Sequence, residues 1–145
     1  MIRAMPAPPD ALRNVPLFAD LNQRELERLA REFKERTFAE GAVVTREGAT
    51  GTGFFVVAEG SASVSVGGEQ RGTLGAGDYF GEIALIDDLP RSATITAATD
   101  LRCYGLTPWE FRPFVEEHPQ VAWVLLRTLA RRLREAQGAS ESVPT

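Results

Sequence analysis

The chain has 145 residues, of which 43% are hydrophobic and 25% charged, so it is long enough for one domain with a buried core and is not of disordered composition. Its formal net charge of −4 argues against direct binding of nucleic acid, which requires a basic face, but is compatible with a small anionic ligand held by a local basic group. The single cysteine, Cys103, and the single histidine, His118, exclude an internal disulfide and a cysteine metal cluster, and leave a zinc site or a Ser-His-Asp triad without grouped partners.

The N-terminal segment is predicted to be a flexible tail over residues 1–13. Prolines interrupt it, and it contains no signal-peptide core. The longest apolar runs, residues 54–58 and 121–126, are too short to span a bilayer. We therefore expect a cytoplasmic protein that makes no contact with a membrane.

A first amphipathic helix is predicted over residues 22–36. Asn22 is a favourable N-cap, and Glu25 three residues later completes a capping box. From Leu26 onward apolar residues recur on one face, which is typical of a helix that packs on a core.

Residues 37–106 carry the signal of short strands. Runs rich in β-forming residues occur at 43–46, 54–57, 61–66, 73–74, 93–97 and 101–106. Glycines separate these runs, and the pair Gly67 and Gly68 is typical of a tight hairpin. Many short strands with glycine turns favour a sandwich, a barrel or a jelly roll.

The helical pattern returns over residues 107–137. Thr107 and Glu110 form a second capping box, and Pro119 opens a further helix with an apolar stripe. This helix is expected to end before residues 138–145, which form a second flexible tail.

The strand pattern breaks between Gly77 and Arg91, where residues 81–86 look like one helical turn inserted between two strands. Gly81 allows the backbone to approach a ligand closely, and the N–H groups of a helical turn form an anion site. Arg91 offers a planar fork for two phosphate oxygens, and an ionised Glu82 accepts a hydrogen bond from a sugar hydroxyl. A phosphate and a sugar hydroxyl together indicate a nucleotide.

The strings FGEIAL at residues 80–85 and PRSAT at residues 90–94 resemble the phosphate-binding cassette of the cyclic-nucleotide-binding domain family. That family includes regulatory subunits of cAMP-dependent protein kinase, cyclic-nucleotide-gated channels and bacterial catabolite activators. Supporting matches extend over residues 14–137, which we take as one domain. We expect a mainly β fold with flanking helices: an eight-stranded jelly-roll β-roll, or double-stranded β-helix, with an N-terminal helix and C-terminal helices.

The resemblance implies that the ligand-binding residues are Gly81, Glu82, Ile83, Ala84, Arg91 and Ser92. Glu82 would accept the ribose 2′-hydroxyl and Arg91 would pair with the cyclic phosphate. The backbone N–H groups of Ile83 and Ala84 would complete the phosphate cradle. Ser92 would lie beside the phosphate and the base. A threonine there often favours cGMP in the family, whereas serine resembles the bacterial cAMP activators, so the expected ligand is cAMP, with cGMP as the alternative.

Two departures from the activators concern DNA and the base. The chain has no helix-turn-helix after its last predicted helix, so we expect no contact with nucleic acid. Ala136 and Gln137 stand where the base contacts would come, and the side chain of Ala136 cannot hydrogen-bond to adenine. Arg132 and Trp123 are then the candidates for a base cap, although such residues are more often a solvated face or a core anchor.

We therefore predict a non-enzymatic cyclic-nucleotide sensor that signals occupancy by repositioning its C-terminal helix to an unidentified effector protein. A homodimer through that helix is a further expectation. No cofactor, metal site or catalytic residue is predicted. The alternative is a degenerate domain of the same fold, used for dimerisation or docking, whose Glu82/Arg91 cradle stays empty or holds a sulfate or other anion. Taken by themselves, Glu82 and Arg91 could also be a structural ion pair in an empty roll. An enzyme is the least favoured class, because no nucleophile and base are grouped.

Overall fold

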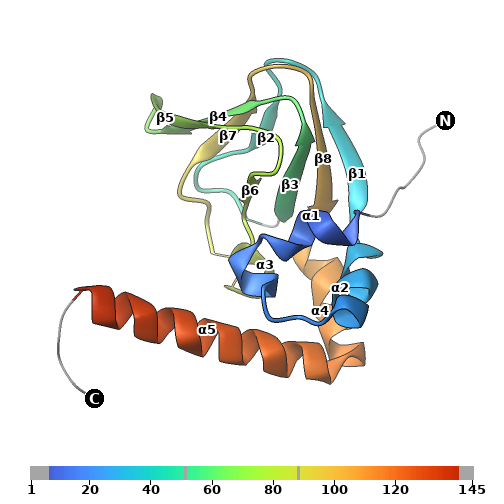
Figure 1. Ribbon diagram of the computed structural model, residues 1–145. Coiled ribbons are helices and arrows are strands. Elements are labelled where there is room, and N and C mark those ends of the chain that lie inside the picture. Colours follow the sequence, from blue (N-terminus) through green and yellow to red (C-terminus); the bar gives the residue numbers. More distant parts are fainter. Residues whose placement is uncertain (1–6, 51, 88, 141–145) are drawn as a thin grey trace.

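The computed structural model describes residues 7–50, 52–87 and 89–140, and its architecture is a β-roll above a layer of helices (Figure 1). The described residues contain eight strands: β1 (Lys34–Phe38), β2 (Val43–Thr45), β3 (Phe54–Glu59), β4 (Ala62–Val66), β5 (Glu69–Leu74), β6 (Tyr79–Phe80), β7 (Thr94–Ala97) and β8 (Leu101–Leu106). The helices are α1 (Pro9–Arg13), the 3-10 helix η1 (Pro16–Phe18), α2 (Gln23–Ala30), α3 (Ala84–Asp87), α4 (Pro108–Glu117) and α5 (Pro119–Ser140).

The strands form two four-stranded antiparallel sheets. One has the order β1-β8-β3-β6 and the other β2-β7-β4-β5, so each sheet combines strands from distant parts of the chain. The hairpin between β4 and β5 turns at Gly67 and Gly68, whose φ angles of 59° and 83° explain why glycine stands at both positions. This is the mainly β class with flanking helices that the sequence predicts.

Strand β3 is covered on both faces, which explains its continuous apolar run. Phe54 and Val56 belong to the core between the sheet and the helical layer, whereas Phe55 and Val57 belong to the core inside the roll. Because alternate residues of a strand point to opposite faces, a strand between two cores needs an apolar residue at every position.

Both predicted capping boxes are present. The Asn22 side chain accepts a hydrogen bond from the Glu25 N–H at 2.9 Å, and the Glu25 carboxylate accepts from the Asn22 N–H at 2.9 Å. Thr107 and Glu110 make the same reciprocal pair at the start of α4. These bonds satisfy N–H groups that a helix start leaves without partners.

The helix expected over residues 22–36 is shorter in the structure. α2 ends at Ala30, and Lys34–Phe38 form β1, which pairs with β8. Phe33, buried between the two, suits a helical face as well as a strand entry. The partner strand lies far along the chain, so local periodicity did not reveal where the helix stops.

The two expected tails also differ from the structure where it describes them. Residues 9–13 form α1, and Leu12 is fully buried in the core below the roll. α5 continues to Ser140, past the predicted end at residue 137. Residues 1–6 and 141–145 lie outside the described residues.

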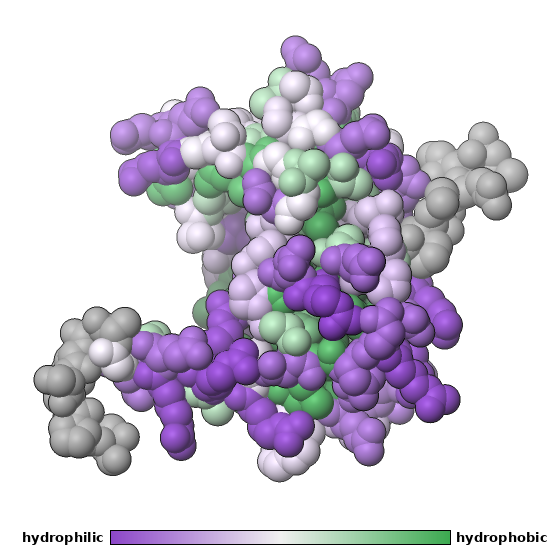
Figure 2. All heavy atoms as spheres, viewed as in Figure 1, coloured by the Kyte–Doolittle hydropathy of each residue, from purple (hydrophilic) through white to green (hydrophobic). Residues whose placement is uncertain are grey.

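Helix α5 runs beneath the roll and extends beyond it (Figure 1). It contacts η1 and α4, and in its first turns the side chains of Val121 and Leu125 are buried. Much of its visible surface is hydrophilic (Figure 2). Among the described helices none is both long and apolar enough to cross a bilayer.

Candidate functional site

A cavity of about 330 Å³ opens between the β6–α3 segment, the loop before β7 and the inner side of the second sheet. Its volume falls in the range of small-molecule sites. All six predicted ligand-binding residues line it, together with groups from β2, β6 and β7. The lining residues are Thr45, Phe80, Gly81, Glu82, Ile83, Ala84, Asp87, Leu89, Pro90, Arg91, Ser92, Ala93 and Ile95.

The backbone of Arg91 is held by the turn that follows β2. The Arg91 N–H donates to the Ala49 carbonyl at 2.9 Å, and the Arg91 carbonyl accepts from the Gly48 N–H at 2.8 Å. Its guanidinium donates to the carbonyl oxygen of Gly53. Two backbone hydrogen bonds and one from the guanidinium therefore hold Arg91 at the cavity wall.

Gly81 is required by this arrangement. Its φ is +88°, and a Cβ built on it would lie 2.6 Å from the Gly53 carbonyl oxygen, besides overlapping the guanidinium of Arg91. Any side chain would push apart the segment that carries Glu82 and the arginine beside it. The glycine thus allows the Glu82 carboxylate, which accepts hydrogen bonds, and the Arg91 guanidinium, which binds anions, to share one small space.

Some N–H groups of the helical turn after Gly81 already donate hydrogen bonds within the turn. The Ala84 N–H donates to the Gly81 carbonyl at 3.2 Å, and the Leu85 N–H to the Glu82 carbonyl at 3.2 Å. The N–H of Ile83 also acts to lower the pKa of the Glu82 carboxyl. A phosphate in the cradle would therefore share or exchange bonds that the turn already makes.

Glu82 is a half-buried carboxyl beside two cations. Burial raises its pKa above the ordinary value, and the charge of Arg132, the N–H groups of Ile83 and Glu82 itself, and the charge of Arg91 act in the opposite direction. Burial also raises the pKa of Tyr79 on β6, helped by the Glu82 charge. The site therefore balances one buried carboxylate against two arginines.

The two predicted base-cap residues lie outside the cavity lining. Trp123 on α5 is 64% exposed. Arg132, also on α5, places Nη1 in a buried position where it has no hydrogen-bond partner among the described residues, and its charge acts on Glu82. Of the pair, Arg132 is the residue whose charge influences Glu82.

Sequence reasoning missed Thr45. This residue of β2 is only 3% exposed, lines the cavity, and donates a hydrogen bond from its hydroxyl to that of Thr52 at 3.3 Å. Its neighbours on that wall, Phe80 and Ile95, are apolar. In the sequence Thr45 is one β-former in a strand run, and only the pairing of β2 with β7 brings it to the site.

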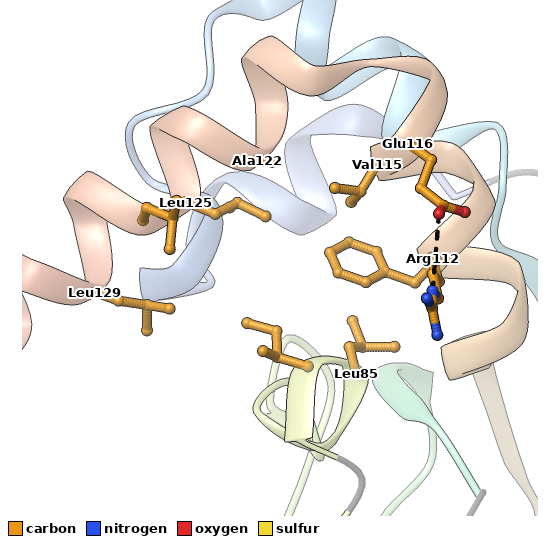
Figure 3. Close-up of a pocket in the computed structure, with 10 residues that line it drawn as sticks. Leu85, Arg112, Val115, Glu116, Ala122, Leu125 and Leu129 are labelled. Atoms are coloured by element: carbon orange, nitrogen blue, oxygen red, sulfur yellow. Dashed lines mark ion pairs between the residues drawn. The ribbon is translucent and has the colours of Figure 1, made fainter.

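A second cavity, of about 380 Å³, is lined by residues of α3, the helix of the predicted cassette, and of α4 and α5 (Figure 3). Leu85 faces Leu125 and Leu129 across it, and Arg112 and Glu116 form an ion pair of 3.9 Å at its rim. Its lining is otherwise mainly apolar. The segment that carries the predicted cradle therefore meets the C-terminal helices through a loosely filled apolar contact.

Cys103 and His118, the other residues with reactive side chains considered in the sequence, pack as structural residues. Burial raises the pKa of the Cys103 thiol to about 11, so it is not an activated nucleophile. His118 stacks on Phe114 with ring centroids 4.6 Å apart, and its Nδ1 lies 2.9 Å from the Phe114 carbonyl oxygen. Within the described residues, no cluster of three or more His, Cys, Asp or Glu side chains is arranged to hold a metal ion.

The sequence is similar to that of a known protein family and of several known proteins. The family model described as the cyclic nucleotide-binding domain matches residues 35–118. A cyclic nucleotide-gated potassium channel from Mesorhizobium japonicum is 38% identical over 125 residues, which cover 86% of this chain and 35% of the channel. A cAMP-dependent protein kinase regulatory subunit from Yarrowia lipolytica is 43% identical over 93 residues, which cover 63% of this chain and 25% of that protein.

A solved structure confirms the predicted fold class. The N-terminal domain of a transcriptional regulator from Streptomyces coelicolor A3(2) matches with a TM-score of 0.82 at 33% identity, over 92% of this chain and 96% of that one. The chain spans about a quarter to a third of the length of the two curated relatives. The likeness to them therefore concerns one domain of each.

Proposed function

The chain belongs to the cyclic nucleotide-binding domain family, and we propose that it is a non-enzymatic sensor whose ligand is cAMP, with cGMP as the alternative. The observation that carries the proposal is the convergence of Glu82 and Arg91 on one cavity, which Gly81 makes compact enough for both. A cyclic nucleotide has the matching pair of groups, a phosphate monoanion and a ribose hydroxyl. The ligand is a signal here and not a cofactor.

Each predicted residue has a role in this proposal. The guanidinium of Arg91 would turn its fork to the phosphate, giving up or sharing the Gly53 carbonyl. Glu82 would accept the ribose hydroxyl, and the N–H groups of Ile83 and Ala84 would bond to phosphate oxygens. Ser92, an exposed residue at the cavity mouth, would contact the phosphate and the base.

The signal would pass from the cassette to α5. Leu85 of α3 lies across the apolar cavity from Leu125 and Leu129 of α5 (Figure 3), and Ile86 also lines this cavity. Helices that pack around a cavity can move without disrupting a close-packed core. A shift of α3 on ligand binding would therefore change the preferred position of α5. An unidentified effector protein would then bind differently to the two positions of α5.

A homodimer through α5 is supported by an apolar row. Trp123, Leu126 and Leu133 are 64%, 53% and 60% exposed, and the spacing of three and seven residues puts them on one side of the helix. Such a row is typical of a seam between two helices. The formal net charge of −4 supports the proposal of a cytoplasmic protein that contacts neither nucleic acid nor membrane.

The experiment that tests the function is calorimetric titration of the purified chain with cAMP and with cGMP. Binding of cAMP at micromolar or better, roughly −8 kcal/mol, is the expected result. The alternative is a degenerate domain used for dimerisation or docking, in which the Glu82/Arg91 cradle is empty or holds a sulfate or other anion. The absence of heat and of thermal stabilisation at millimolar cyclic nucleotide would favour that alternative.

A further inference from the structure

Asp20 lies in the turn between η1 and α2 and holds two side chains of α5. Its Oδ2 accepts hydrogen bonds from Thr128 Oγ1 and from Arg131 Nη1, both at 2.7 Å. Thr128 is fully buried, whereas the side chains of Asp20 and Arg131 are 40% and 50% exposed. The two bonds to Asp20 lower its pKa, so the carboxylate stays charged across the neutral range.

The residue after Arg131 is the one that acts on the ligand cavity. Successive residues of a helix point about 100° apart, so Arg131 and Arg132 serve adjacent faces of α5. Arg131 is bound to Asp20, while the Nη1 of Arg132 is buried, and the charge of Arg132 acts to lower the pKa of Glu82 and of Tyr79. In the described residues no direct ion pair joins Arg132 to Glu82, so the attraction acts across a gap and depends on where the helix lies.

We propose that Asp20, which does not line the cavity, is a positioning residue of the nucleotide site: by holding Thr128 and Arg131 it fixes the part of α5 that carries the buried guanidinium of Arg132, whose charge acts on Glu82. The proposal rests on the nucleotide-binding function only for its effect on affinity. Its structural part, the dependence of the Glu82 environment on Asp20, concerns the chain without ligand.

The charges around Glu82 show what that placement achieves. The charges of Arg132 on α5 and of Arg91 in the loop before β7 act on it, its own charge acts on Tyr79 of β6, and Asp87 of α3 lines the same cavity. Burial raises the pKa of Glu82, and Arg132 is the first among the opposing influences. If α5 turned or lifted, the pKa would rise further, and fewer Glu82 side chains would be ionised to accept the ribose hydroxyl.

An ordinary surface ion pair would have no such effect. Exposed pairs contribute little to stability, and Arg131 has a second partner of that kind in Glu135, at 3.6 Å on the same helix. The Asp20 contact differs because one of its donors, the Thr128 hydroxyl, is buried. Glu135→Gln is therefore a matched control, since it removes a carboxylate from Arg131 but leaves the connection between α5 and the turn before α2.

The first test uses the chain without nucleotide. NMR titration of the Glu82 side-chain carboxyl, in protein labelled with ¹³C, is carried out on wild type, Asp20→Asn, Arg132→Gln and Glu135→Gln. We expect the Glu82 pKa to rise in Asp20→Asn and in Arg132→Gln and to stay at the wild-type value in Glu135→Gln. An unchanged Glu82 pKa in folded Asp20→Asn would overturn the proposal.

The second test measures cAMP affinity by calorimetry in a double-mutant cycle. Asp20→Asn should weaken binding by about three- to tenfold, the scale of one or two hydrogen bonds, and by more as the pH is lowered. In the Arg132→Gln background, Asp20→Asn should have almost no further effect on cAMP affinity, because the charge through which Asp20 acts has been removed. Equal effects in both backgrounds would overturn the proposal. If wild type binds neither cAMP nor cGMP, the proposed function fails, and the carboxyl titration still decides the role of Asp20.

Discussion

The guanidinium of Arg91 donates a hydrogen bond to the carbonyl oxygen of Gly53, the residue before β3. Gly53 itself packs against the end of β8: a Cβ there would lie 2.5 Å from the Leu106 carbonyl oxygen. The cation of the candidate site is thus joined to the junction where β8 passes into α4. A phosphate that draws Arg91 away would loosen that contact.

Loss of Arg91 should weaken nucleotide binding more than any other single change at the site. Removing one partner of a buried charge pair costs about 2–5 kcal/mol, so Arg91→Ala should reduce cAMP affinity by about thirtyfold to several thousandfold. Arg91→Lys should also bind poorly, because an ammonium cannot reproduce the planar fork. Glu82→Gln should have the smaller effect, since an amide carbonyl still accepts a hydrogen bond. Calorimetry on variants shown to be folded by circular dichroism measures the order. Wild-type affinity in folded Arg91→Ala would place the phosphate elsewhere.

Position 92 should influence the choice of base. With serine there, cAMP should bind at least as well as cGMP, and Ser92→Thr should improve cGMP relative to cAMP. Paired titrations of wild type and variant with both nucleotides give the ratio. A clear preference of the wild type for cGMP, or a ratio untouched by the substitution, would contradict this assignment.

Thr45 should contribute to affinity through its hydroxyl. It is the polar group on a wall formed by Phe80 and Ile95, and Thr45→Val keeps its shape. Loss of one hydrogen bond, about 1 kcal/mol, should weaken cAMP binding by about fivefold. Thr52→Val is the control, because it removes the partner hydroxyl, which does not line this cavity. If both variants bind equally, the Thr45 hydroxyl does not contact the ligand.

Helix α5 should become better protected when the ligand binds. Its side toward α3 borders an apolar cavity, and its later turns are largely exposed, so its present packing is incomplete. Hydrogen exchange followed by mass spectrometry, with and without cAMP, should show slower exchange after Pro119. Protection confined to the segment around Arg91 would mean that binding is not transmitted to the helix.

The contribution of Asp20 to stability should depend on pH. Its pKa in the folded chain lies below the ordinary 3.8, so its bonds stabilise the fold above that value, and the stabilisation is lost as the pH falls through the folded pKa. Asp20→Asn should therefore be less stable than wild type at pH 7, with the difference shrinking below about pH 3.8. Urea unfolding at a series of pH values measures it. A difference that persists unchanged in acid would show that the carboxylate charge is not involved.

Local chemistry determined much of this protein from its sequence. Capping at Asn22 and Thr107 and the glycine hairpin at 67–68 depend on residues within a few positions of one another. Short-range hydrogen bonds and backbone preferences act at that scale, so the pattern of residues is enough to predict them. The fold class followed from the same signals together with the family resemblance.

Contacts between distant segments were decided only in the tertiary structure. The early end of α2, the place of Thr45 on the cavity wall, and the bond of Asp20 to α5 each need a partner far along the chain. Their energies arise from strand pairing and burial, which no local window contains. Asp20 in the sequence is one acid in a polar turn; it acquires its two donors because the apolar residues of α5 bring that helix against η1.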